Sequence, residues 1–199
     1  MKLKPDALLF DLDGVLVDSL DAWWLALNDS FKKYSYNPVS REYFIDRFWG
    51  HDLFDNIKNN DIPLEVGLYC NKAYKNHTSR VRIYDETIPV LEKLQSYKKC
   101  IITNTPRDST EDILNIFNLS KFFNYTFTSD DVKMGKPDPE IILKSCSKLN
   151  VKPKDVVIIG DTESDVKAGH AAGCKVIGIN VKANITIKNL SETLEHITI

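Results

Sequence analysis

The stretch LLFDLDGVLVDS, residues 8–19, runs from an apolar segment straight into two carboxylates at alternate positions, Asp11 and Asp13, and then into Gly14. A short apolar run that ends in a turn is typical of a buried strand. Side chains two positions apart in a strand point to the same face. We therefore expect Asp11 and Asp13 to project together from the end of a strand.

Further apolar runs predict the other strands of a parallel sheet. The predicted strands cover residues 7–10, 100–103, 156–160 and 175–179, and residues 125–128 offer a fifth. Segments 87–97 and 108–117, which lie between them, carry apolar residues at helical spacing. Strands that alternate with helices favour an α/β fold, in which ligands bind beyond the carboxyl ends of the strands.

Residues 18–82 interrupt this alternation. They contain three helical patterns, at 21–34, 41–48 and 64–77, and no convincing strand. This is too much chain for one crossover between strands. We therefore predict a core domain formed by residues 1–17 and 83–199, with a small helical domain of residues 18–82 inserted after the first strand.

Composition excludes several classes of function. The chain has 199 residues and a net charge of −2 without a basic cluster, so nucleic acid is not an expected partner. The four cysteines are far apart and form no C-x-x-C pair, which argues against a zinc site. The apolar run near the N-terminus is too short for a signal peptide or a membrane span. We expect a cytoplasmic protein.

The acidic pair itself has three interpretations. Two carboxylates held close together either share a proton or bind a metal ion. The D-x-D-G sequence is also common in ordinary acidic turns. An EF-hand calcium loop is excluded, because its ligand and glycine positions would fall on Val15, Leu16 and Ala22.

A second acidic motif follows another predicted strand. In VVIIGDTESDVKAGHAAG, residues 156–173, Asp161 and Asp165 come just after the apolar run. Magnesium prefers oxygen ligands, so these carboxylates could complete a metal site with the first pair. Alternatively, Asp161 caps a helix that begins near Thr162, and Asp165 interacts favourably with the helix dipole. The two roles can coexist.

Polar groups also follow the predicted strand at 100–103. Thr103, Asn104 and Thr105 offer hydroxyls, an amide and backbone N–H groups at the start of a helix, which suits a phosphate oxyanion. The same residues can start a helix without any ligand.

Lys136 lies in MGKPDP, between Gly135 and Pro137. The proline makes a mid-helix position unfavourable, and Asp130 stands where a phosphate-binding P-loop would need glycine. A loop lysine of this kind is usually a solvated surface charge.

In their order along the chain, D-x-D-G-V, T-N-T, G-K-P-D-P and G-D-x-x-x-D resemble the four motifs of the haloacid dehalogenase (HAD) superfamily of phosphohydrolases. The resemblance covers essentially the whole chain. The helical insert is similar to the C1 cap of that superfamily, nearest the phosphoglycolate phosphatase and beta-phosphoglucomutase group. The resemblance implies a Rossmann-like parallel sheet with an inserted helical cap domain, and hydrolysis of a small phosphorylated metabolite.

The resemblance also implies catalytic roles. Asp11 would be the nucleophile that forms an aspartyl-phosphate, and Asp13 the general acid and base. Thr103 and the backbone of Asn104 would bind the transferred phosphate oxygens, and Lys136 would offset charge on the nucleophile and the phosphate.

A Mg²⁺ ion is implied as the cofactor. The Asp11 carboxylate, the Asp13 backbone carbonyl and Asp161 would hold it, and Asp165 would bind it directly or through water.

Some residues depart from particular branches of the superfamily. The phosphonate hydrolases and the dehalogenases lack an aspartate at the position of Asp13, so neither activity is favoured. Trp23 stands where hexose-phosphate mutases have a histidine, which makes hydrolysis the better expectation than mutase activity. Tyr84, Asp85 and Glu86 replace the usual Pro-Gly after tyrosine, so the geometry of the return from the cap stays open.

The cap offers candidates for substrate specificity. Gly50 matches the cap glycine that faces the active site in relatives, with Trp49 and His51 beside it. Simple helix packing is the alternative role for Trp23, Trp24 and Trp49.

The sequence leaves the substrate open. Arg41, Arg47 and Lys72 are available on the cap, but nothing ranks phosphoglycolate above a sugar phosphate, a nucleotide or pyrophosphate. A sugar-phosphate mutase and a non-catalytic binder of a phosphorylated ligand remain as alternative functions. We favour a monomer.

Overall fold

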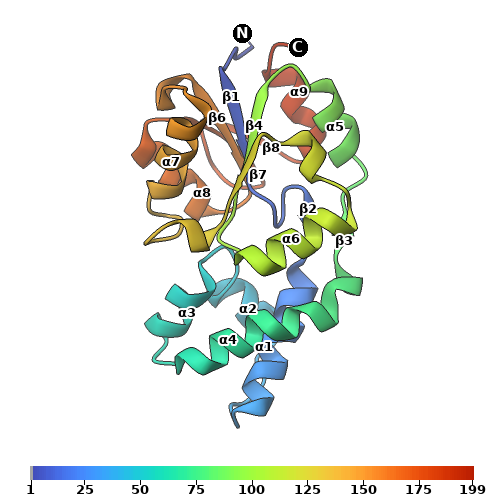
Figure 1. Ribbon diagram of the computed structural model, residues 1–199, viewed down its shortest axis with the longest axis vertical. Coiled ribbons are helices and arrows are strands. Elements are labelled where there is room, and N and C mark those ends of the chain that lie inside the picture. Colours follow the sequence, from blue (N-terminus) through green and yellow to red (C-terminus); the bar gives the residue numbers. More distant parts are fainter. Residues whose placement is uncertain (1) are drawn as a thin grey trace.

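A six-stranded parallel sheet forms the centre of the computed structural model, which describes residues 2–199 (Figure 1). The strand order is β5-β4-β1-β6-β7-β8. The strands are β1 (Ala7–Phe10), β4 (Lys98–Ile102), β5 (Tyr125–Phe127), β6 (Val156–Gly160), β7 (Lys175–Ile179) and β8 (Ile185–Ile187). The five predicted strands are confirmed with small shifts of their ends, whereas β8 was not expected.

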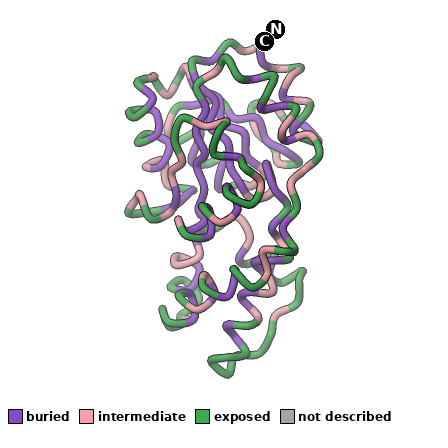
Figure 2. The backbone as a smooth tube through the Cα atoms, turned by 45° about the vertical axis from the view of Figure 1, so that its right-hand side comes forward, coloured by how far each residue is buried: buried purple, intermediate pink, exposed green. Residues whose placement is uncertain are grey.

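Helices cover both faces of this sheet because the central strands β1 and β6 are buried and apolar along their whole length. The helices of the sheet domain are α5 (Thr87–Lys93), α6 (Arg107–Ile116), α7 (Glu140–Leu149), α8 (Glu163–Ala172) and α9 (Thr193–His196). Leu8 and Phe10 of β1 pack in one buried cluster with residues of α5 and α6. The intervening Leu9 packs with α7 and α8 on the other face. Figure 2 shows the resulting buried centre of the molecule.

The predicted helical insert lies beyond the carboxyl ends of the central strands (Figure 1). It contains α1 (Leu20–Lys33), α2 (Arg41–Arg47), α3 (Leu53–Asn59), α4 (Leu64–Tyr74) and a 3-10 helix, η1 (Lys75–Arg80). Its two longest helices, α1 and α4, pack together, and the rings of Trp23 and Tyr74 stack with centroids 4.0 Å apart. Helix α3 was not expected from the sequence.

Further short 3-10 helices lie in the connections of the sheet domain. They are η2 (Ser120–Phe122), η3 (Ser129–Asp131), η4 (Pro153–Asp155) and η5 (Leu190–Glu192). Within residues 2–199, no helix combines the length and apolar composition that crossing a membrane requires.

The chain enters and leaves the helical segment through a two-stranded antiparallel ribbon. Strands β2 (Val17–Asp18) and β3 (Arg82–Ile83) pair with each other, with Val17 opposite Ile83. The expectation that residues 18–82 contain no strand is therefore wrong at both ends of the segment. The hydroxyl of Thr87 donates to the carbonyl oxygen of Leu16 at 2.8 Å. This bond links the chain that returns from the helical segment to the chain that enters it. The domain boundaries at 18 and 82 stay a prediction.

Candidate active site

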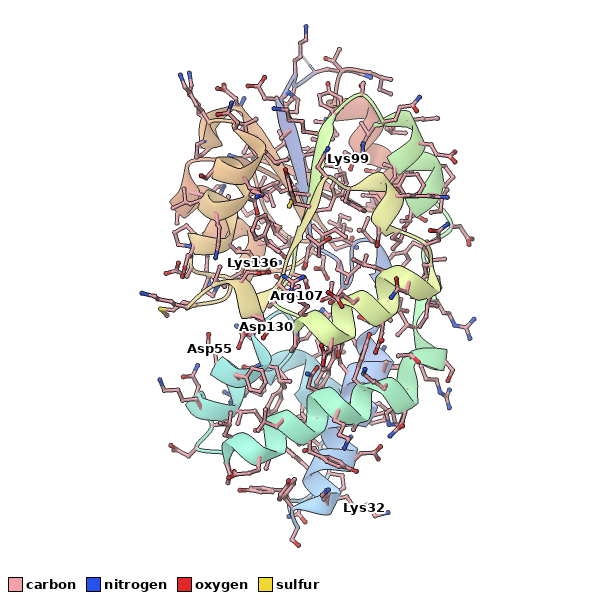
Figure 3. All side chains as sticks on the ribbon, viewed as in Figure 1. Lys32, Asp55, Lys99, Arg107, Asp130 and Lys136 are labelled. Atoms are coloured by element: carbon pink, nitrogen blue, oxygen red, sulfur yellow. The ribbon has the colours of Figure 1, made fainter. Side chains whose placement is uncertain are left out.

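The polar groups of the site follow three neighbouring strands and lie at the carboxyl edge of the sheet. Asp11 follows β1, Thr103 follows β4 and Asp161 follows β6, and these strands are adjacent in the order β4-β1-β6. The carboxyl ends of parallel strands therefore bring these side chains together. Lys136 comes from the connection between β5 and α7 and lies where the sheet meets the helical segment (Figure 3).

Gly14 allows the chain to turn close to the second acidic motif. Its φ of +80° is a conformation that residues with a Cβ rarely adopt. A Cβ atom at this position would also lie 2.0 Å from Oδ2 of Asp161. Glycine after the D-x-D sequence is thus required both by the backbone and by the approach of Asp161.

Lys136 is buried among anionic groups and is not a solvated surface charge. Its side chain is 2% exposed, and Nζ lies 3.0 Å from Oδ1 of Asp11 and 2.6 Å from Oδ1 of Asp165. Nζ also donates to the carbonyl oxygen of Ile102 at 3.0 Å. Burial alone would lower the pKa of Lys136, but the charges of the two aspartates outweigh it and raise the pKa. The amine stays an ammonium ion beside Asp11.

The side chain of Asn104 fixes the backbone of Lys136. Asn104 Nδ2 donates to the carbonyl oxygen of Lys136 at 2.8 Å, and the N–H of Lys136 donates to Asn104 Oδ1 at 2.7 Å. Both side chains are buried. The sequence suggested the amide and backbone of Asn104 for phosphate binding; the contact of its amide with a residue 32 positions away has no local sequence signal.

Asp13 has hydroxyl groups as partners instead of an ammonium. Thr105 Oγ1 donates to Oδ2 of Asp13 at 2.6 Å and Thr103 Oγ1 to the same oxygen at 3.4 Å, while the hydroxyl of Ser19 donates to Oδ1. The sequence did not single out Ser19, which belongs to the quoted stretch but carries no motif. Asp11 and Asp13 are therefore neighbours in different surroundings.

Asp165 has no free carboxylate oxygen. Oδ1 is bound by Lys136, and Oδ2 accepts from the N–H of Thr162 at 3.1 Å and from its hydroxyl at 2.6 Å. Thr162 is the N-cap of α8, and Asp165 closes a capping box with it. The interpretation of Asp161 as the helix cap is therefore wrong, because Thr162 fills that position.

Within residues 2–199, one carboxylate oxygen of Asp161 is left without a partner in the acidic cluster. Carboxylate oxygens of Asp11, Asp161 and Asp165 all lie within 4.8 Å of one another. Oδ1 of Asp161 is buried and has no hydrogen-bond partner. A buried polar atom without a partner is costly, which a cation bound to it would relieve. The all-oxygen donor set fits a hard ion such as Mg²⁺.

Burial and the closeness of several carboxylates also shift the pKa values of Asp11 and Asp161. Burial raises the pKa of Asp11 to about 7; the Lys136 ammonium opposes this shift, while the carboxylates of Asp165 and Asp13 add to it. Burial also raises the pKa of Asp161, and the charges of Asp11 and Asp165 add to that shift. The carboxylates of this cluster therefore carry more negative charge than the ammonium of Lys136 can neutralise.

A pocket joins these groups to the helical segment. Asp11, Asp13, Thr103, Asn104 and Lys136 line its floor. The predicted specificity residues Trp49, Gly50 and His51 all line its wall, together with Trp23. Trp24 does not line it, and its indole N–H donates to the carbonyl oxygen of Val39 at 2.9 Å.

Gly50 brings the helical segment into contact with the sheet domain. It has a φ of +78°, and a Cβ atom there would lie 2.6 Å from Cγ2 of Thr162, at the start of α8. The predicted cap thus touches the helix that carries the second acidic motif.

Comparisons with known proteins agree with this geometry. The family of haloacid dehalogenase-like hydrolases matches residues 8–179. The pyrophosphatase PpaX of Bacillus mycoides (strain KBAB4) is 30% identical over 184 residues, which cover 89% of this chain and 85% of the relative.

Solved structures share the fold. A protein from Lactobacillus plantarum proposed to be a phosphoglycolate phosphatase superposes with a TM-score of 0.88 at 22% identity, covering 97% of this chain and 99% of that one. CbbY from Rhodobacter sphaeroides, solved in complex with phosphate, gives a TM-score of 0.84 at 17% identity over 94% of this chain and 96% of that one. With its family match from residue 8 to residue 179, the chain belongs to the haloacid dehalogenase-like hydrolases and is a phosphatase of that family.

Proposed function

We propose that this phosphatase cleaves a small phosphate monoester in two steps, with Asp11 as nucleophile and Asp13 as general acid and base. The observation that carries the proposal is the difference between two neighbouring carboxylates. Asp11 lies 3.0 Å from a buried ammonium, whereas Asp13 is held by hydroxyl groups. One acid is thus suited to attack and the other to proton transfer.

In the first step, a carboxylate oxygen of Asp11 attacks phosphorus and the ester P–O bond breaks. The N–H of Leu12 donates to Oδ1 of Asp11 at 2.8 Å and, with Lys136, fixes the orientation of the carboxylate. Lys136 also offsets the negative charge that accumulates during attack on a phosphate dianion. Thr103 and the backbone N–H of Asn104 would bind the transferred oxygens.

Asp13 moves the protons of both steps. Its protonated form donates to the oxygen of the leaving alcohol, and the resulting carboxylate then accepts a proton from the water that attacks the aspartyl-phosphate. The hydroxyl groups of Ser19 and Thr105 hold the Asp13 carboxyl in one place for both transfers.

The acidic cluster would hold Mg²⁺ through the Asp11 carboxylate, the Asp13 backbone carbonyl and Asp161. A bound magnesium ion supplies positive charge that lowers the repulsion between the nucleophile and the phosphate. We assign Asp165 contact through water and a positioning role, because both of its oxygens already bind Lys136 or Thr162.

Residues 18–82 would act as the cap domain that excludes bulk water during the reaction. Trp49, Gly50 and His51 would contribute to specificity from the cap side of the pocket. Trp23 lines the same pocket where a mutase of this family would have a histidine, which supports hydrolysis over mutase activity. The cytoplasmic location and the monomeric state stay predictions.

The proposal is tested by phosphate release from a panel of phosphate monoesters, with Mg²⁺ or with excess chelator. We expect turnover with Mg²⁺, none with chelator, and none for Asp11→Asn under either condition. Asp46→Asn is the matched control, because this exposed aspartate pairs only with Arg47 at the surface. Near-normal activity of Asp11→Asn, or activity that survives the chelator, would contradict the mechanism.

A further inference from the structure

The pocket has a polar floor and an apolar wall. The floor consists of the groups at the sheet edge that the proposed reaction uses. The helical segment supplies a wall dominated by aromatic and aliphatic side chains, namely Trp23, Leu27, Phe44, Phe48, Trp49 and Leu53. The alcohol part of a bound ester must face this wall, because the floor takes its phosphate.

The wall offers no cation to a second negative charge. Among the described residues, Lys136 is the one lysine or arginine in the lining, and both Asp11 and Asp165 already bind it. Arg41 pairs with Asp21 at 2.7 Å on the surface and is not in the lining.

The cations Arg47, Lys72 and Arg107 also lie outside the lining. Arg47 pairs with Asp46 at 3.1 Å, and Lys72 is exposed outside the lining. Arg107, which Figure 3 shows near the helical segment, pairs with Asp131.

The few polar groups of the wall are also poorly suited to an anion. Asn56 uses its Nδ2 to donate to the carbonyl oxygen of Phe48 at 2.9 Å. Burial raises the pKa of the Cys70 thiol, so this side chain stays neutral. His51 remains as the one imidazole, and it lies at the exposed rim. A carboxylate or a second phosphate against this wall would lose its hydration without gaining a charged partner.

We propose that this enzyme prefers phosphate monoesters whose leaving alcohol is uncharged and apolar, an aryl or alkyl alcohol that packs against the aromatic wall. The inference rests on the proposed function and specifies its substrate class. Water supplies the oxygen that ends on phosphorus, the P–O bond to the alcohol breaks, and the alcohol leaves with the proton from Asp13. Pyrophosphate and phosphoglycolate, which place a second anion on the leaving side, are poor substrates.

The preference is measured as kcat/KM with saturating Mg²⁺ for four compounds: benzyl phosphate, glycerol 3-phosphate, phosphoglycolate and pyrophosphate. We expect benzyl phosphate to exceed the two anionic compounds by at least about tenfold, the scale of discrimination by an apolar pocket. Glycerol 3-phosphate, with an uncharged polar alcohol, should fall between them. A higher value for either anionic compound, or for glycerol 3-phosphate, than for benzyl phosphate would overturn the inference.

A charge placed in the wall provides a second test. Leu53 is half-buried in the lining, at the first position of α3. Leu53→Lys should shift the ratio of benzyl phosphate to phosphoglycolate by about tenfold toward the anion, because it supplies the missing partner. Leu53→Met, of similar length without charge, should keep the ratio of the wild type. An unchanged ratio in a folded Leu53→Lys protein would show that this wall does not select the leaving group.

The test separates this inference from the function on which it rests. p-Nitrophenyl phosphate, an activated aryl ester of the preferred class, reports phosphatase activity even when its leaving group receives no proton. Inactivity toward every compound, this ester included, would overturn the proposed function and the inference with it. Activity with a preference for the anionic substrates would overturn the inference alone.

Discussion

Asp11 and Asp13 stand two positions apart, but their partners assign them different chemistry. An ammonium orients Asp11, and hydroxyls hold Asp13. We predict that Asp13→Asn blocks the second step more than the first when the leaving group needs no protonation. With p-nitrophenyl phosphate, this variant should release a burst of about one nitrophenol per enzyme and then stall, because no base activates water.

Rapid-mixing absorbance measures the burst of Asp13→Asn, and thermal unfolding checks that the fold is kept. Steady turnover should fall by about a thousandfold, within the usual range of general acid and base catalysis. Steady turnover near that of the wild type would contradict the assignment of Asp13.

Asn104 is a second residue whose partners determine its role. Its amide makes two hydrogen bonds with the backbone of Lys136. We predict that Asn104→Ala lowers kcat by about tenfold to a hundredfold and destabilises the fold by about 1–3 kcal/mol, because buried partners lose their hydrogen bonds and Lys136 loses its fixed position.

Steady-state kinetics and urea unfolding test Asn104→Ala. Asn37→Ala, at an exposed asparagine outside the pocket lining, is the control and should change neither quantity. If Asn104→Ala lost stability but kept the kcat of the wild type, its amide would have no part in placing Lys136.

At the residue scale, the sequence predicted where the candidate reacting groups lie better than it predicted their surroundings. The end of an apolar run predicted that Asp11 and Asp13 project together at a sheet edge, because strand ends and turns are local properties, whereas only the family resemblance gave Lys136 a place beside them. The burial of Lys136 could not be read from its loop, since it depends on Asp165, 29 positions away. The contact of Asn104 with Lys136 could not be predicted for the same reason, whereas Ser19 lies only six positions from its partner Asp13 and carries no motif that marks it.

At the element scale, the buried strands were predictable because each is a continuous apolar run. Strand β8 was missed because Thr186 interrupts its three residues and the polar Asn184 and Lys188 flank it, so it forms no continuous apolar run. Helix α3 was missed although Asp52 is its N-cap, with a side chain that accepts from the N–H groups of Phe54 and Asp55, and aspartate there is a usual signal for a helix start. The ribbon strands β2 and β3, of two residues each, depend on pairing between segments far apart in the chain.

A substitution at Gly50 tests the contact between the helical segment and Thr162 at the start of α8. We predict that Gly50→Ala lowers kcat/KM by about tenfold, because a Cβ there both strains the backbone and collides with Thr162. Gly173→Ala is the matched control: its φ is +83°, but a Cβ there meets nothing within 4 Å.

Both glycine variants should lose stability, by about 1 kcal/mol for the backbone conformation alone. Only Gly50→Ala should lose activity, which enzyme kinetics beside urea unfolding will show. Equal kcat/KM values for the two variants would mean that the contact with Thr162 does not position the cap.

At the scale of the whole molecule, the acidic cluster makes stability depend on pH when magnesium is removed. Asp11 loses its proton near pH 3.8 in the unfolded chain and near about 7 in the fold. The folded state therefore binds more protons between these values, so its stability is highest below the lower pKa and falls as pH rises through the upper one.

We predict that in chelator the free energy of unfolding decreases between about pH 4.5 and about pH 7.5, by an amount on the order of a few kcal/mol from Asp11. Urea unfolding across this range measures it. Asp11→Asn should flatten the slope, and saturating Mg²⁺ should reverse it, because the ion binds the ionised carboxylates. A slope that Asp11→Asn leaves unchanged would place the origin of the pH dependence elsewhere.

The ribbon of β2 and β3 also suits replacement of the helical segment by another insert. Because Val17 and Ile83 are paired neighbours, the chain leaves the sheet domain and returns to it at almost the same point. Paired residues of an antiparallel ribbon lie only about 5 Å apart, so any insert whose two ends meet at that spacing can be joined there without changing the path of the core. We expect that a foreign lid grafted at this junction, with Ser19 kept in place to hold Asp13, changes which leaving group the enzyme accepts while the phosphoryl chemistry is kept.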